Sequence, residues 1–225
     1  MFSVQGVTKR FGTQLVLDNV ELKVNSEIKA LIGINGSGKS TLLKIVCGIV
    51  ETDQGKIIIN GRDITALSPE ERNVGYVPQH PALFSHLSIK KNIRYGMRNG
   101  RGTEESYQQL IQLLGLKDVL DKKPGQVSGG YQHRVSLARA LVPQPDVLMM
   151  DEPLSGIDTV QKVKMIPEFR KILKQLEVPG LFVTHDSEEA HLLADSFAAI
   201  INGQVYNMES AQEAFLSING TAQTR

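Results

Sequence analysis

The pattern of apolar and polar positions near the start of the chain predicts a small antiparallel sheet. Residues 16–24 alternate apolar and polar side chains, which is typical of a strand with one buried and one solvated face. A second run rich in β-branched residues, 57–59, ends at the turn sequence Asn60-Gly61. We expect the residues up to Asn25 to form this sheet together with residues 57–61.

Farther along, short apolar runs alternate with helical patterns, which predicts an α/β core with a largely parallel sheet. Strands are expected at residues 28–32, 73–78, 146–150, 181–184, 197–201 and 204–208. Helices are expected at residues 39–49, 160–176 and 188–193. From residue 88 to about residue 142 the pattern is helical only, at residues 89–95, 104–114 and 131–141. This block is therefore interpreted as a helical subdomain inserted in the core.

Composition and charge exclude several classes of protein. The chain carries 25 basic and 24 acidic side chains, a net charge of +1, which gives no support to nucleic-acid binding. No apolar stretch is long enough to span a bilayer and the first residues do not resemble a signal peptide, so we expect a cytoplasmic protein. The single cysteine, Cys47, is expected to be a small buried hydrophobic residue. His86, His133 and His191 are expected at the surface.

The strongest chemical motif is the run GINGSGKS at residues 33–40, which matches the phosphate-binding pattern G-x-x-x-x-G-K-[ST] in full. A strand is predicted before it and a helix after it. Glycines let backbone N–H groups surround phosphates, and the helix presents its positive end to them. Lys39 is expected to reach the β- and γ-phosphates, and Ser40 to bind Mg²⁺. The residues assigned to nucleotide binding here are Asn35, Gly36, Ser37, Gly38, Lys39, Ser40 and Thr41.

Polar side chains follow three other predicted core strands. Asp151 and Glu152 come directly after the apolar run 147–150, where Asp151 suits the magnesium shell and Glu152 can polarise an attacking water. Gln79 and His185 each follow a predicted strand in the same way. If these strands are parallel, all of these residues meet the phosphate loop at one edge of the sheet. We therefore expect Gln79 and His185 to lie near the γ-phosphate.

The run VSGGYQHR, residues 127–134, resembles the signature motif of ABC ATPases. The other segments fall in the order of that family: Phe11, the phosphate loop, Gln79, the signature, Asp151-Glu152-Pro153, Ser155-Gly156-Ile157-Asp158 and Thr184-His185. The resemblance covers essentially the whole chain. It implies one ABC ATPase domain over residues 1–225 with a P-loop NTPase (RecA-like) core, divided into residues 1–84 with the β subdomain, a helical subdomain at about 85–142, and the rest of the core at 143–225.

The resemblance also implies roles for these residues. Two copies would pair head to tail with ATP and Mg²⁺ between them, and Ser128, Gly129 and Gly130 of one copy would contact the γ-phosphate bound by the other. Glu152 would be the general base, His185 the γ-phosphate sensor, and Gln79 a link from magnesium to a membrane partner. Asp158 would cross the dimer interface. Phe11 would stack on adenine, the alternative for Phe11 being a packed core aromatic.

Some positions depart from the family pattern. Val127 and Tyr131 stand where the family usually has Leu and Gln, and Gly156 stands where Ala is usual. The residues that would contact phosphate are intact, so we expect ATPase activity, at a rate that Tyr131 could alter.

Residues 83–97 look like those of importer ATPases of the oxyanion, polyamine and sugar group, and residues 92–97 and 163–167 resemble molybdate importers most closely. This implies transmembrane permease subunits as partners, docked near residues 80–93 at the inner face of the cell membrane, and an extracytoplasmic substrate-binding protein. The chain stops at Arg225, so no C-terminal regulatory domain is expected. Two alternatives remain open: a soluble ABC ATPase such as an iron–sulfur assembly ATPase, and a cassette that binds ATP only to hold a complex together.

Overall fold

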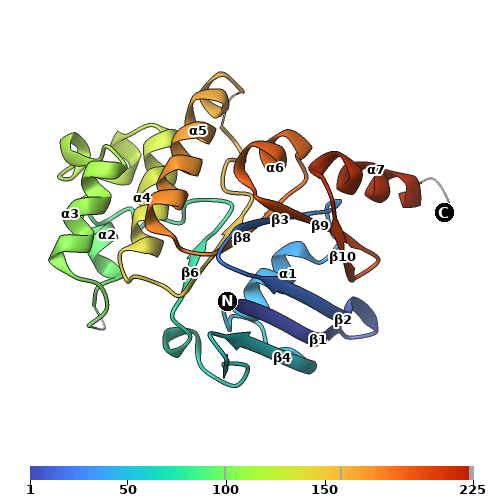
Figure 1. The fold of residues 1–225 in the computed structure, drawn as a ribbon. Coiled ribbons are helices and arrows are strands. Elements are labelled where there is room, and N and C mark those ends of the chain that lie inside the picture. Colours follow the sequence, from blue (N-terminus) through green and yellow to red (C-terminus); the bar gives the residue numbers. More distant parts are fainter. Residues whose placement is uncertain (99, 158, 223–225) are drawn as a thin grey trace.

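The N-terminal sheet has four antiparallel strands in the order β2-β1-β4-β5 (Figure 1). The computed structural model describes residues 1–98, 100–157 and 159–222. The strands of this sheet are β1 (Phe2–Phe11), β2 (Gln14–Val24), β4 (Gln54–Ile59) and β5 (Arg62–Asp63). In β2 the apolar residues Val20, Leu22 and Val24 are buried while the polar residues between them are exposed. The alternation therefore turns the apolar side of β2 toward the core, and the predicted antiparallel sheet is confirmed.

The core sheet has six strands in the order β10-β9-β3-β8-β7-β6. These are β3 (Ile28–Ile32), β6 (Val74–Val77), β7 (Val147–Asp151), β8 (Gly180–Thr184), β9 (Ser196–Ile201) and β10 (Gln204–Met208). Neighbouring strands from β9 to β6 pair in parallel, and β10 is antiparallel to β9. Every residue of β3, β7 and β8 is buried, as expected of central parallel strands covered on both faces. The predicted α/β fold with a mostly parallel sheet is confirmed.

One face of the core sheet packs on α1 (Lys39–Val46) and the antiparallel sheet. Leu42 and Leu43 of α1 share a hydrophobic cluster with residues of both sheets. The helix ends earlier than the predicted residue 49, because Gly48 adopts the left-handed conformation, φ +76°, that commonly ends helices. Cys47 is buried there, and burial raises the pKa of its thiol to about 12, which fits its expected role as a small hydrophobic residue.

The remaining helices form a second hydrophobic core on the other face of this sheet. They are α2 (Ile89–Tyr95), α3 (Glu104–Leu113), α4 (Gly129–Leu141), α5 (Thr159–Leu176), α6 (Ser187–Leu193) and α7 (Ala211–Ala222), with short 3-10 turns at Pro69–Glu71, Lys117–Val119 and Pro124–Gln126. In Figure 1, α2, α3 and α4 lie together at one end of the molecule. Helix α7 was not predicted from the sequence; it packs on β9 through Ala211, Ala214 and Ile218.

Helix α4 corrects two expectations. It begins at Gly129 rather than at residue 131, so that Ser128, with an extended backbone, occupies the position before the first helical residue. His133 was expected at the surface but is only 6% exposed. The reason is its spacing: His133, Leu137 and Leu141 recur every four residues and share the buried side of the helix. Among the residues that the structure describes, no helix has the length and apolar character needed to cross a membrane.

Candidate nucleotide-binding site

The phosphate loop, residues 33–38, joins the end of β3 to the start of α1. Gly38 has φ +103°, and a Cβ there would lie 2.9 Å from Leu17 Cδ2 and 3.0 Å from the Val16 carbonyl oxygen. Only glycine fits that backbone at that distance. A Cβ at Gly36, also at positive φ, would meet no atom within 4 Å. The loop therefore packs against Val16 and Leu17 on one side and is open on the other. On the open side, the N–H groups at the start of α1 can bind an anion.

Lys39 reaches back across this loop. Its Nζ donates hydrogen bonds to the carbonyl oxygens of Gly33 at 2.8 Å and Ile34 at 2.9 Å, and the residue is only 5% exposed. Burial lowers the pKa of its ammonium group, and the negative charges of Glu152 and Asp151 partly offset this effect. The result is a poorly hydrated cation at the loop, which is suited to bind an anion such as a phosphate group.

Asp151, at the end of β7, faces Ser40 in the first turn of α1. Ser40 Oγ donates to Asp151 Oδ1 at 2.8 Å, and Tyr76 Oη of β6 donates to Asp151 Oδ2 at 3.3 Å. Burial raises the pKa of Tyr76, so its hydroxyl stays protonated as a donor. A hydroxyl and a carboxylate this close can share a hard cation, and Mg²⁺ takes one or two protein carboxylates together with substrate phosphates. No cluster of three or more His, Cys, Asp or Glu that could hold a metal ion occurs in the described part of the chain.

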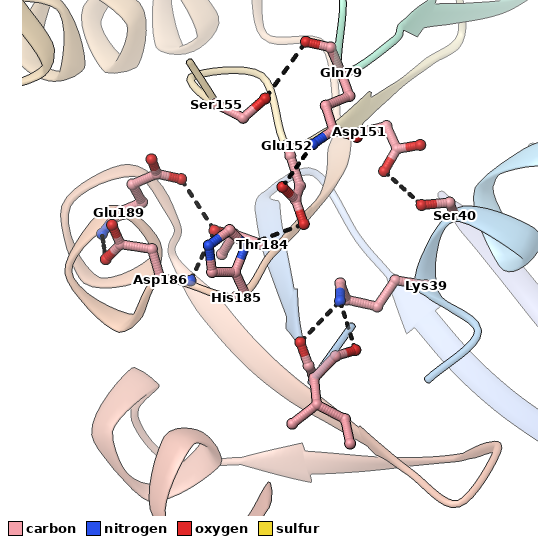
Figure 2. Close-up of polar contacts among 12 residues, drawn as sticks. Lys39, Ser40, Gln79, Asp151, Glu152, Ser155, Thr184, His185, Asp186 and Glu189 are labelled. Atoms are coloured by element: carbon pink, nitrogen blue, oxygen red, sulfur yellow. Dashed lines mark hydrogen bonds and ion pairs between the residues drawn. The ribbon is translucent and has the colours of Figure 1, made fainter. Parts of the chain in front are cut away.

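Glu152 contacts side chains that follow two other strands of the core sheet. Its Oε2 accepts a hydrogen bond from Gln79 Nε2 at 3.1 Å, and its Oε1 lies 3.1 Å from His185 Nδ1 (Figure 2). Gln79 follows β6, Glu152 follows β7 and His185 follows β8. Glu152 has φ +44°, a left-handed conformation that is unfavourable for a side-chain-bearing residue, and its N–H donates to the Val183 carbonyl oxygen at 3.0 Å. Strained backbone conformations of this kind cluster at active sites.

These groups border a cavity of about 540 Å³, large enough for a small-molecule ligand. Its lining residues come from both sheets and from the phosphate loop: Phe11, Val16, Asn35, Gly36, Gly38, Lys39, Ser40, Thr41, Gln79, Glu152, Ser155 and His185. Phe11 is 49% exposed at the end of β1 and lines this cavity, so it is not a packed core aromatic. Lys9 Nζ lies over its ring, 5.4 Å from the centroid, and the exposed part of the ring faces solvent.

The signature residues lie apart from these lining residues. Ser128 precedes α4, where its side chain makes no hydrogen bond to the first turn of that helix, and Gly129 and Gly130 open the helix. Tyr131 follows them and is 36% exposed. Asp158 lies outside the residues that the structure describes. The sequence analysis gave no role in the site to Tyr76, Val16 or Ser155. Tyr76 lies on the strand that leads to Gln79, which was the available signal.

Comparison with known proteins agrees with this geometry. Residues 17–155 match the family described as ABC transporter. The chain is 42% identical to a molybdate/tungstate import ATP-binding protein of Archaeoglobus fulgidus, over 98% of this chain and 92% of that protein. It is 40% identical to a sulfate/thiosulfate import ATP-binding protein of Synechocystis, over 94% of this chain, and it spans only 61% of that longer relative.

A solved structure of a dimeric ATP-binding cassette in a post-hydrolysis state, bound to ADP and Pi, has the same fold. Its TM-score is 0.78 at 26% identity, over 94% of this chain and 99% of the solved chain. The chain therefore belongs to the ABC transporter family, in which it is an ATP-binding ATPase domain.

Proposed function

We propose that this chain hydrolyses ATP in a head-to-tail dimer and thereby drives an importer of an oxyanion such as molybdate or tungstate. One observation carries the catalytic part of the proposal. The Glu152 carboxylate is held between Gln79 and His185 beside the cavity that the phosphate loop borders. A carboxylate held in this way can take a proton from a water molecule that attacks a bound γ-phosphate.

The chemistry assigns a separate task to each group. The phosphate loop binds the ATP phosphates through backbone N–H groups, and Lys39 exchanges its two carbonyl partners for the β- and γ-phosphate oxygens. Glu152 accepts a proton from the attacking water, whose oxygen bonds to the γ-phosphorus as the bond to the ADP oxygen breaks. His185 holds a γ-phosphate oxygen. Mg²⁺ bound by Ser40 and Asp151, with Gln79 nearby, would neutralise charge that develops on the phosphate oxygens.

Dimer formation completes the site in this proposal. Ser128, Gly129 and Gly130 lie at the N-terminal end of α4, where backbone N–H groups can bind a phosphate. In a head-to-tail pair these residues would contact the γ-phosphate held by the other copy, and Asp158 would lie near the interface. Ser128 is exposed and makes no capping hydrogen bond to α4; this exposure and the dimeric state of the similar solved structure support the arrangement.

Transport requires a membrane partner. An aromatic cluster, formed by Phe84 and by Tyr95 at the end of α2, is suited to bind one. Phe84 and Tyr95 have ring centroids 4.6 Å apart, Arg98 lies over Tyr95, and Arg139 lies over Phe84. Tyr95 is 41% exposed. We assign this cluster to a helix of a permease subunit, which would hold the chain at the cytoplasmic face of the membrane. The similarity to the Archaeoglobus importer protein supports molybdate or tungstate as the substrate, delivered by an extracytoplasmic binding protein.

Copurification from native membranes tests the transport role. The tagged chain, extracted in mild detergent, should bring with it an integral membrane protein, and the complex should hydrolyse ATP faster when a binding protein loaded with molybdate is added. A Phe84→Ala/Tyr95→Ala variant should lose the permease. Tyr206→Ala, which removes an exposed aromatic on β10, should keep it. Recovery of only soluble partners would contradict the transporter proposal and favour a soluble ABC ATPase, whereas a permease complex without ATP turnover would favour a purely structural cassette.

A further inference from the structure

Glu189 of α6 is a buried carboxylate outside the cavity described above. It is 4% exposed, and its Oε2 accepts a hydrogen bond from Thr184 Oγ1 at 3.0 Å. Its Oε1 accepts a hydrogen bond from Lys162 Nζ of α5. A buried carboxylate without a cation nearby would be strongly unfavourable, so Lys162 and Glu189 are required together. Lys162 Nζ also lies 3.8 Å from Asp186.

This ion pair contacts both neighbours of His185 in the chain, Thr184 and Asp186. Thr184 Oγ1 accepts a hydrogen bond from the Asp186 N–H at 3.0 Å. Asp186 Oδ1 in turn accepts from the N–H groups of Glu188 at 2.9 Å and Glu189 at 3.2 Å, which caps α6. Figure 2 shows the contacts that join Thr184 to Glu189 and to Asp186 next to His185, with Glu189 on the side away from Lys39. The residues before and after His185 are therefore both held by one hydrogen-bonded network.

His185 itself has little else to hold it. Its side chain is 57% exposed, and its imidazole contacts Glu152 through one nitrogen. A ring with that much exposure keeps its direction only if the backbone that carries it is fixed. The Thr184 hydroxyl and the Asp186 N–H, both bonded within the Glu189 network, restrain the backbone before and after His185.

We propose that Lys162, Glu189 and Thr184 form a positioning network that sets the distance between His185 and the γ-phosphate, and that Lys162 extends this control to the first turn of α5. This inference rests on the proposed role of His185 in ATP hydrolysis. Helix α5 follows the loop that carries Ser155, which lines the nucleotide cavity. A shift of α5 relative to α6 would therefore reach the neighbours of His185 through the contacts of Lys162 with Glu189 and Asp186.

The test measures steady-state ATP hydrolysis by the purified full chain and its variants. Glu189→Gln, Lys162→Met and Thr184→Val should each lower kcat roughly tenfold or more, because small misplacements of a catalytic group have effects of this size. KM for ATP should stay within about twofold, since the phosphate loop is untouched. Thr184→Ser keeps the hydroxyl and should remain close to the original chain. In a Glu152→Gln background, Glu189→Gln should also reduce the fraction of chain found as ATP-bound dimer.

The matched control is Lys174→Met. Lys174 lies on the same helix and pairs with Asp195 at 2.7 Å, near the opposite end of β3, so this variant breaks an ion pair of α5 without touching the His185 loop. It should keep its kcat. The inference is overturned if the network variants turn over ATP within about twofold of the original chain, or if Lys174→Met loses as much kcat as they do. If Lys162→Met does not fold, the difference between Thr184→Val and Thr184→Ser decides the question.

His185→Ala separates failure of this inference from failure of the proposed function. If His185→Ala loses turnover while the network variants do not, only the positioning role is wrong. If His185→Ala hydrolyses ATP like the original chain, the proposed role of His185 is itself wrong and the network has no catalytic group to position.

Discussion

His185 Nδ1 lies 3.1 Å from Glu152 Oε1, although 33 positions separate the two residues in the chain. The parallel strands β7 and β8 are neighbours and end at the same edge of the sheet, which brings the two side chains together. The imidazole can thereby orient the carboxylate with one nitrogen while the rest of the ring remains exposed for a γ-phosphate oxygen. This pairing explains why both residues are assigned to one step of the reaction.

Replacing His185 by alanine should separate binding from turnover. His185→Ala should bind ATP with nearly unchanged affinity, because Lys39 and the phosphate loop are untouched. Its kcat should fall roughly a hundredfold or more, since Glu152 loses a partner and the γ-phosphate loses a donor. Nucleotide titration and steady-state hydrolysis on the same preparation measure both quantities. A large loss of affinity with unchanged kcat would contradict the assignment.

Phe11 should contribute to affinity through the adenine ring. Phe11→Ala should weaken ATP binding by roughly 1–3 kcal/mol, the range measured for a base stacked on an aromatic side chain. Phe11→Tyr, which keeps the stacking face, should bind as the original chain does. Binding of inorganic triphosphate, which has no base, should be the same in all three proteins, and an equal loss for triphosphate would argue that Phe11 acts on the loop instead.

Lys39 should matter for nucleotide binding and not for folding. Burial lowers the pKa of this ammonium group, so the unfolded chain holds its proton more tightly and the charge opposes folding at neutral pH. Lys39→Met removes this charge but also two hydrogen bonds to the Gly33 and Ile34 carbonyl oxygens, so without nucleotide it should unfold at a temperature close to that of the original chain. ATP affinity should fall by roughly 2–5 kcal/mol, as when one member of a buried charged pair is removed. Calorimetry measures both, and unchanged affinity would refute the phosphate role.

His133 should make the stability of the fold depend on acid pH. Burial lowers the pKa of His133 from its ordinary value of 6.5; a contact with the Pro153 backbone opposes this and nearby His80 adds to it. Below that ordinary value the unfolded chain takes up a proton that the folded chain does not, so stability is lost as the pH falls. Denaturant unfolding at pH 7.5 and 5.5 should show a smaller loss for His133→Gln. An identical loss in both proteins would mean that other groups cause it.

Much of the fold follows from local pattern, because each central strand is a short apolar run and β2 alternates apolar and polar residues from Val20 to Val24. The positions just past β3, β6, β7 and β8 could be predicted for the same reason, since parallel strands end at one edge. Helix α7 was not predicted, because Asn219 and Gly220, two poor helix formers, interrupt its second half. It forms where Ala214 and Ile218 can pack on the sheet.

Side-chain contacts between neighbouring strands could not be predicted from the sequence. The hydrogen bond from Tyr76 to Asp151 depends on the register of β6 against β7, which the pattern of either strand does not specify. The left-handed backbone of Glu152 likewise depends on the surrounding structure. The burial of His133 is predictable from its spacing with Leu137 and Leu141, because residues four positions apart share one side of a helix.

The most direct test of this account compares ATP hydrolysis and oligomeric state for the original chain and Glu152→Gln. Glutamine has nearly the same shape but cannot accept the proton of the attacking water. Steady-state hydrolysis, with size-exclusion chromatography and light scattering in ATP, gives both readings on one sample. The account expects retained ATP binding, a loss of turnover of roughly a hundredfold or more, and accumulation of an ATP-bound dimer. Near-normal hydrolysis by Glu152→Gln would contradict the central assignment.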